Sequence, residues 1–152
     1  MSRAFVKDTE DTEDLPDRPI SGLPNDVTAE GFRRIEEALA AAQAAQAAAQ
    51  AAGDRDALAA ARRDVRYWSA RRATAAVIPE PADHSVVRLG HTVTIVREDH
   101  RRQTFRIVGE DEADPAHGTI SHASPLARAL FGRSVGDVVV MAGGEAEIVE
   151  IR

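Results

Sequence analysis

The sequence predicts an α+β protein in which a pair of antiparallel helices precedes a small β-sheet domain. Two apolar seams with heptad spacing, separated by one glycine turn, fill much of the first half of the chain. The second half carries short β-branched runs between glycine-containing turns, with one brief helical pattern among them. We therefore predict three segments: a tail over 1–26, a coiled-coil hairpin over 27–78 and a sheet domain over 79–152.

Acidic residues and prolines dominate the tail predicted over 1–26. Large apolar side chains are few there, so the segment buries too little surface to offset the entropy that it would lose on ordering. We predict that it is disordered, and we favour a solvated tail over one that binds a partner. Its acidic residues and prolines include Asp8, Glu10, Asp11, Glu13, Asp14, Asp17, Pro16, Pro19 and Pro24.

The first helix has two candidate N-caps, Asp26 and Thr28. Low complexity over 40–52 is also typical of a flexible linker. Alanine and glutamine are good helix formers, however, and this stretch reaches Gly53 without another glycine or a proline, so we favour a helix. Its apolar seam comprises Phe32, Ile35, Leu39, Ala42, Gln46 and Ala49.

The second helix follows a turn at residues 53–56, which we predict to be the tip of the hairpin. Pro79 and Pro81 end the pattern, because proline cannot continue a helix. The seam of this helix comprises Leu58, Ala61, Val65, Trp68, Arg72 and Ala75. Its outer faces are basic, which fits either a solvated surface or a docking patch, and they carry Arg62, Arg63, Arg66 and Arg71.

The sheet domain is predicted to contain one short helix between its last strands. Ser124 can cap this helix, Pro125 can take its first position, and Gly132 can end it. We expect strands at 86–89, 91–96, 103–108, 119–121, 138–141 and 146–151. The run over 138–141 reads as a buried strand because it is continuously apolar.

Composition excludes several classes of protein. A net charge of −6 and an aromatic content of 4% argue against nonspecific binding to nucleic-acid phosphates or bases. The chain has no cysteine for disulfides or thiolate metal sites, and its five histidines are too scattered to form a metal site. It also has neither a long apolar run nor a leader-like start. We expect a monomer in the cytoplasm that contacts no membrane.

Three motifs in the sheet domain resemble one family. FRIVGEDEADPAHGTIS, SPLARALFG and VGDVV, at 105–121, 124–132 and 135–139, resemble the C-terminal domain of the bacterial transcript-cleavage factors GreA and GreB. The resemblance implies an FKBP-like antiparallel sheet wrapped on one helix, which docks on core RNA polymerase beside its secondary channel. The docking residues that it implies are Ile120, Ser121, Ser124, Pro125 and Arg128.

The tip sequence Gly53-Asp54-Arg55 resembles that of GreB. In the family, two tip acids help to hold a Mg²⁺ in the polymerase active site, so that the polymerase hydrolyses backtracked RNA near its 3′ end. Asp54 matches the first acid and is the implied metal ligand, whereas the second acid, a glutamate, falls on Ala57. Asp56 is one residue early, which on a helix turns a side chain by about 100 degrees. Alternatively, Asp54 and Asp56 only stabilise the second helix through its dipole.

The arms of the hairpin align with about eight to ten residues fewer than in the family, which shortens them by about 12–15 Å. We therefore expect a polymerase-binding factor of the secondary channel, closer to GreB, with weak or absent support of RNA cleavage. It would be no enzyme itself and hold no cofactor of its own, at most sharing Mg²⁺ with the polymerase. The alternatives are an active cleavage factor that uses Asp54 and Asp56, and an interaction module with a different partner.

Overall fold

The computed structural model describes residues 14–152. These residues form two compact units. Unit 1 comprises residues 14–22 and Ile35–Thr74, and unit 2 comprises Leu23–Arg34 and Ala75–Arg152. This division places the first turns of the first helix in unit 2, and it therefore differs from the three segments predicted from the sequence. Those segment boundaries stay a prediction.

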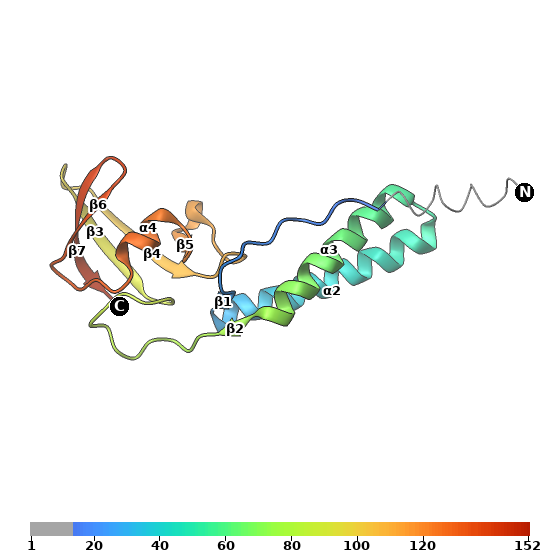
Figure 1. Cartoon of the computed structure of the whole chain (residues 1–152), viewed down its shortest axis with the longest axis horizontal. Coiled ribbons are helices and arrows are strands. Elements are labelled where there is room, and N and C mark those ends of the chain that lie inside the picture. Colours follow the sequence, from blue (N-terminus) through green and yellow to red (C-terminus); the bar gives the residue numbers. More distant parts are fainter. Residues whose placement is uncertain (1–13) are drawn as a thin grey trace, which may run out of the picture. The chain divides into compact units, whose positions relative to one another are not determined.

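The helices α2 (Ala29–Ala52) and α3 (Arg55–Thr74) form a hairpin and are drawn side by side in Figure 1. Unit 1 contains α3 and the part of α2 from Ile35 onward. The seam predicted for the first helix lies inside, since Ile35, Ala42 and Ala49 are buried. The low-complexity stretch is thus helical. No helix in the described part of the chain is long and apolar enough to cross a membrane.

The seam of α3 departs from the predicted positions near its C-terminal end. Ala61 is buried as expected, but Arg71 is only 2% exposed, whereas Arg72 is exposed. The Arg72 guanidinium lies 3.3 Å from the Glu36 carboxylate of α2. A long arginine side chain can follow the hairpin surface and carry its charge to an acidic partner, so a seam position need not bury it.

Residues 14–22 run as extended chain beside α3 (Figure 1), and the disorder predicted for the tail over 1–26 stays a prediction. Asp17 pairs with Arg66 at 2.6 Å, and Arg18 pairs with Asp64 at 3.1 Å. The charges of this segment are thus complementary to those of α3, which a count of apolar residues does not detect. The first half of the predicted tail, residues 1–13, lies outside the described residues.

Unit 2 contains a five-stranded sheet with the strand order β5-β4-β3-β7-β6. Its β4–β5 pair is parallel, so the sheet is mixed and the prediction of a purely antiparallel sheet is wrong in that detail. The other neighbouring pairs are antiparallel. The strands are β3 (Thr92–Arg97), β4 (Arg102–Val108), β5 (Thr119–Ser121), β6 (Val138–Met141) and β7 (Gly144–Ile151).

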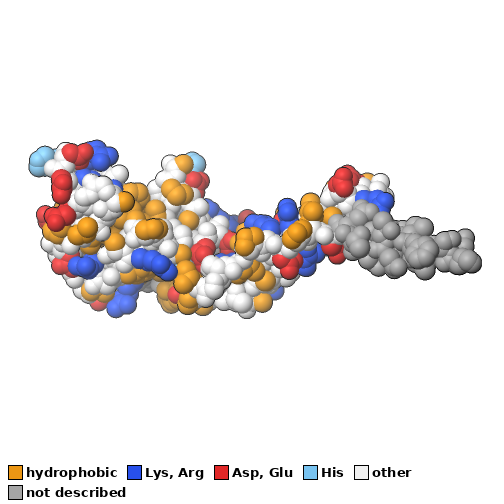
Figure 2. Space-filling model, turned by 45° about the horizontal axis from the view of Figure 1, so that its top comes forward, with side chains coloured by type: hydrophobic (Ala, Val, Ile, Leu, Met, Phe, Trp, Pro, Cys, Tyr) orange, Lys and Arg blue, Asp and Glu red, His pale blue; other side chains and the backbone are white. Residues whose placement is uncertain are grey.

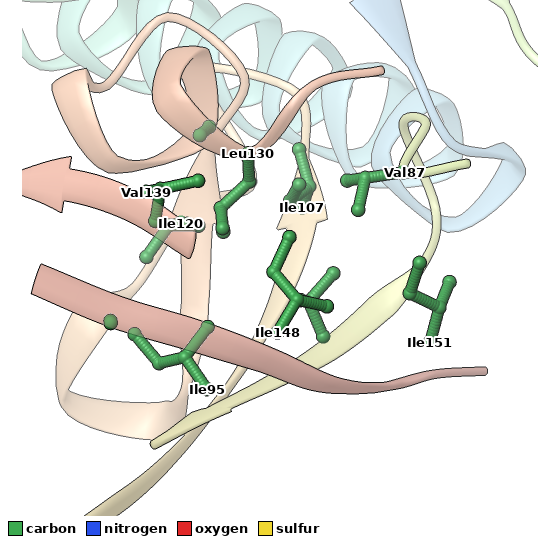
Figure 3. Packing of buried hydrophobic residues seen from close by; sticks show 11 residues of the cluster. Val87, Ile95, Ile107, Ile120, Leu130, Val139, Ile148 and Ile151 are labelled. Carbon is green, nitrogen blue, oxygen red and sulfur yellow. The ribbon is translucent and has the colours of Figure 1, made fainter. Parts of the chain in front are cut away.

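A β-bulge in β7 sets which side chains enter the core. Val93 pairs with Ile151 and Ile95 pairs with Ile148, so β7 uses one residue more than β3 across this interval. Ile148 and Ile151 are three positions apart and would face opposite sides of a regular strand. The extra residue turns both toward the same core, where Figure 3 shows them beside Ile95 and Val87.

One short helix, α4 (Pro125–Leu130), covers the core face of this sheet. Ser124 Oγ accepts a hydrogen bond from the Ala127 N–H at 3.2 Å, and Pro125 takes the first position, as predicted. Gly132 follows the helix with a φ of +75°, which suits glycine. Ala127 and Leu130 are fully buried, so α4 is fixed against the sheet by its apolar side. A 3₁₀ turn, η1 (Pro115–His117), precedes β5.

The start of α2 is held within unit 2. A small parallel pair, β1 (Asp26–Val27) with β2 (Ala76–Val77), lies directly before the helix. Thr28 is the N-cap, because its Oγ1 accepts a hydrogen bond from the Gly31 N–H at 2.9 Å. The same hydroxyl donates to the buried Glu112 carboxylate. Glu112 follows β4, so residues far apart in the sequence secure the first turn of α2.

Candidate functional site

The tip of the hairpin is a tight turn between α2 and α3. Gly53 has a φ of +68°, a left-handed conformation that glycine adopts without steric cost. The Gly53 N–H donates to the Gln50 carbonyl at 3.2 Å, and the Asp54 N–H donates to the Ala49 carbonyl at 3.0 Å. These two bonds form a Schellman motif, which satisfies the last carbonyls of α2 and reverses the chain.

Asp54 also starts α3. Its carboxylate accepts a hydrogen bond from the Ala57 N–H at 3.1 Å, and its carbonyl accepts the Leu58 N–H at 2.9 Å. Asp54 is thus the N-cap of α3 as well as the residue after the α2 turn. The side chain is exposed while it makes this bond. A structural role for Asp54 is therefore present whether or not the carboxylate also serves chemistry.

Asp56 lies in the first turn of α3, where the helix dipole favours a carboxylate. Asp54, Asp56 and Ala57 are all exposed. The helix already begins at Arg55, so the side chains of Asp56 and Ala57 point about 100 degrees apart around the axis. Asp56 thus does not occupy the direction in which a glutamate at position 57 would project.

The chemistry available at the tip is that of hard oxygen donors. Carboxylates suit Mg²⁺, which is commonly held by one or two of them together with water or substrate oxygens. Within residues 14–152, no three His, Cys, Asp or Glu side chains gather into a group that could hold a metal ion. Asp54 and Asp56 could therefore contribute to a metal site that a partner completes.

The second candidate site is a groove beside α4 in unit 2. It has a volume of about 460 Å³ and is lined mainly by apolar side chains. Its lining residues are Arg97, Ile120, Ser124, Pro125, Leu126, Ala129, Val140, Met141 and Ala142. Figure 2 shows hydrophobic side chains reaching the surface of the sheet unit on the face in view. An apolar groove of this kind suits contact with an apolar side chain of a partner.

The groove brings together three of the five docking residues that the family resemblance implies. Ile120, Ser124 and Pro125 line it. Ile120 is only 6% exposed, so most of its side chain serves the core. The other two, Ser121 and Arg128, are not among the lining residues: Ser121 Oγ accepts the Ala123 N–H at 3.0 Å, and Arg128 is exposed on α4.

Sequence reasoning missed the β6 side of the groove. We predicted a buried strand at 138–141, but β6 is an edge strand, on which Val138 is 49% and Val140 is 76% exposed. Val139 between them is buried, so the strand alternates. Three consecutive valines conceal that alternation, and the one available signal was the short length of the run next to a glycine turn.

A buried histidine, His91, lies directly before β3 and contacts the exposed His84. The Nδ1 atom of His91 accepts the Arg88 N–H at 2.9 Å, so the neutral ring carries its proton on Nε2. This Nε2 lies 3.0 Å from Nδ1 of His84. Burial lowers the pKa of His91 below its ordinary value, and the neighbouring His84 lowers it further. The neutral form of His91 is therefore favoured.

Fold and site together define a two-unit α+β protein that presents carboxylates at a helical tip and an apolar groove beside a capped helix. Residues 82–152 match the family model described as the C-terminal domain of transcription elongation factor GreA/GreB. This part of the chain is thus a GreA/GreB C-terminal domain, as its motifs predicted. The expected closeness to GreB stays a prediction.

Curated relatives agree with this assignment. The chain is similar to the transcription elongation factor GreA of Alkalilimnicola ehrlichii, with 51% identity over 71 residues, which cover 43% of this chain and 45% of that protein. It is also similar to GreA of Shouchella clausii, with 45% identity over 78 residues, covering 48% and 49%. The match thus spans less than half the length of these relatives.

Two solved structures resemble the chain over most of its length. One is GreA factor homolog 1 (Gfh1) of Thermus thermophilus, with a TM-score of 0.41, 23% identity, and coverage of 86% of this chain and 99% of that one. The other is the transcription elongation factor GreA/GreB of Nitrosomonas europaea, with a TM-score of 0.40, 23% identity, and coverage of 83% and 97%.

Proposed function

We propose that this chain is a Gre-family factor that binds core bacterial RNA polymerase as a monomer in the cytoplasm and acts in the secondary channel, with weak or absent support of RNA cleavage. Unit 2 supplies the docking surface, centred on the groove beside α4. Family membership and the position of the SPLAR motif at this groove support the docking part. The chain would be no enzyme itself, since the polymerase carries out any hydrolysis.

One observation carries the proposal of weak cleavage support. α3 begins at Arg55, which makes both Asp56 and Ala57 helical. The family resemblance implies a second acid at position 57, and Asp56 points about 100 degrees away from it. Asp54 is already engaged as the N-cap of α3. A tip with one matched acid and one methyl group is poorly suited to share a Mg²⁺ with the polymerase.

The length of the helices supports the same view. α3 has 20 residues and is about 30 Å long at the usual rise per residue. The alignment with the family implies arms that are shorter by about 12–15 Å. A carboxylate binds Mg²⁺ at a distance of about 2 Å, so a deficit of this size would remove the contact.

An assay on backtracked elongation complexes tests the proposal. We expect the chain to bind core polymerase in a pull-down and to release few or no short 3′ RNA fragments in the presence of Mg²⁺. Ala57→Glu restores the identity of the second acid but not the length of the arms, so it should still leave cleavage weak. Absence of polymerase binding would favour an interaction module with a different partner.

The active cleavage factor remains the second candidate, because both tip carboxylates are exposed within one turn. In that case Asp54, with Asp56, would hold the shared Mg²⁺ near the RNA 3′ end. Mg²⁺-dependent release of fragments that is lost in both Asp54→Ala and Asp56→Ala would establish this candidate and refute weak cleavage support.

A further inference from the structure

The outer face of α3 carries arginines whose partners come from the chain's own N-terminal segment. Arg62 lies 3.6 Å from Asp14, and Arg66 lies 2.6 Å from Asp17. These arginines are one helical turn apart and therefore lie on the same face. We call Arg62 and Arg66 the arginine face, and residues 14–18 the strap. Both belong to unit 1.

The strap is bound as an extended peptide. A second nitrogen of Arg66 donates to the Leu15 carbonyl at 2.8 Å, so one guanidinium binds both backbone and side chain of the strap. Leu15 and Arg18 each precede a proline, which biases them toward extended conformations. The segment is thus preorganised for the shape in which it binds.

Arg18 is the basic residue of the strap, and it contacts an acidic residue and two aromatic rings of α3. Its guanidinium lies 3.1 Å from the Asp64 carboxylate and 3.8 Å from the centre of the Tyr67 ring. It also lies 5.5 Å from the centre of the Trp68 ring. Each of these three charged strap residues therefore meets an opposite charge on α3, acid on arginine and arginine on acid.

These contacts are of a kind that can be released. The side chains of Arg62, Arg66 and Asp17 are 44%, 40% and 75% exposed, and exposed ion pairs are individually weak and screened by salt. An internal segment that binds weakly can be displaced by an external peptide of like chemistry.

We propose that the arginine face of α3, with Asp64 and Tyr67, is a binding surface for an extended acidic peptide of a partner protein, and that the strap occupies this surface as an internal competitor. The partner segment carries two carboxylates flanked by residues that keep it extended. The surface belongs to unit 1 and is separate from the groove beside α4, so this proposal does not depend on the proposed function.

The test uses the full chain and a synthetic peptide with the sequence of residues 14–22. Asp14→Asn, Asp17→Asn and Arg18→Ala together disable the strap. The chain has one tryptophan, so the indole N–H signal of Trp68 reports the surface without ambiguity in an NMR titration. We expect the peptide to shift this signal in the variant at a concentration at least about fivefold lower than in the unaltered chain, since it no longer competes with a tethered segment.

Two controls make the outcome decisive. Glu145→Gln with Glu147→Gln removes two charges from exposed positions of β7 and should leave the titration as in the unaltered chain. A peptide with both aspartates replaced by asparagine should not shift the signal. Equal titration of the strap variant and the unaltered chain would overturn the proposal. So would a single-stranded RNA oligonucleotide that shifts the signal at lower concentration than the peptide, since the surface would then recognise nucleic acid.

Discussion

The hydroxyl of Thr28 lies 2.7 Å from each of the two carboxylate oxygens of Glu112, and both residues are buried. The same hydroxyl accepts the Gly31 N–H, so it joins the first turn of α2 to the loop after β4. A buried carboxylate needs such partners, because losing them would leave its charge without compensation. This contact within unit 2 therefore fixes the N-terminus of α2, and we call it the Thr28–Glu112 anchor.

Thr28→Val should destabilise the protein by on the order of 2 kcal/mol, the sum of a lost N-cap and a poorly satisfied carboxylate. Unfolding in urea, followed by circular dichroism, measures the change. Thr28→Ser keeps the hydroxyl and should stay within about 0.5 kcal/mol of the unaltered chain. If valine were as stable as serine at this position, the anchor would have no energetic importance.

The effect of Gly31→Ala on the free energy of unfolding should depend on the residue at position 112. A Cβ at Gly31 would overlap the Glu112 carboxylate and displace it from Thr28, although alanine favours helices by about 1 kcal/mol over glycine. We expect Gly31→Ala to destabilise the unaltered chain and to stabilise a Glu112→Ala chain. A double-mutant cycle of unfolding free energies measures this coupling. Additive effects would argue against the overlap.

Stability should fall as the pH drops below about 6.5, the ordinary pKa of histidine, because burial lowers the pKa of His91 in the folded chain. The unfolded state then binds more protons than the folded state, so stability is complete above this pH and decreases below it. Protonation would also remove the acceptor of the Arg88 N–H. The limiting slope for one group is about 1.4 kcal/mol per pH unit.

Unfolding in urea at pH 7.0 and 5.5 measures this dependence. His91→Asn keeps an acceptor near Arg88 without a titrating ring, and it should flatten the slope over this interval. His100→Asn removes an exposed histidine and is the matched control for the loss of an imidazole ring. An unaltered slope in His91→Asn would assign the pH dependence to other groups.

The features that the sequence predicted well are those with local causes. Helix α4 follows from Ser124, Pro125 and Gly132, whose capping and backbone preferences act within a few residues. The low-complexity part of α2 follows from the high helix propensity of alanine. Neither needs knowledge of distant parts of the chain, so the pattern alone is sufficient.

The features that the sequence did not predict depend on distant partners. Val138 and Val140 are exposed because they lie on the face of β6 opposite the buried Val139, and three consecutive valines do not reveal which face meets the core. The strap binds because Asp17 meets Arg66, 49 positions further along. The parallel pairing of β5 likewise depends on how the chain returns to β4. A sequence motif gives the positions of such residues along the chain, but it does not give their tertiary partners.

Val140→Asp should weaken binding to core polymerase by at least about tenfold, because it places a charge in the apolar groove beside α4. The side chain is 76% exposed, so folding should be little affected. Val138→Asp is the matched control, since Val138 is exposed on the same strand but does not line this groove. The affinity of each variant is measured on surface-coupled polymerase, and its stability is measured by thermal unfolding. Equal loss of binding in both variants would place the docking surface elsewhere.

Asp54 allows its structural and chemical roles to be separated. Asparagine caps helices about as well as aspartate, so Asp54→Asn should keep the stability of the hairpin to within a few tenths of a kcal/mol, whereas Asp54→Ala should lose about 1 kcal/mol. Thermal unfolding measures this difference. If cleavage support is weak, as we propose, both variants should leave the yield of RNA fragments from backtracked complexes at the level of the unaltered chain. A carboxylate that binds Mg²⁺ would give the opposite pattern, because asparagine would preserve the fold and still abolish cleavage.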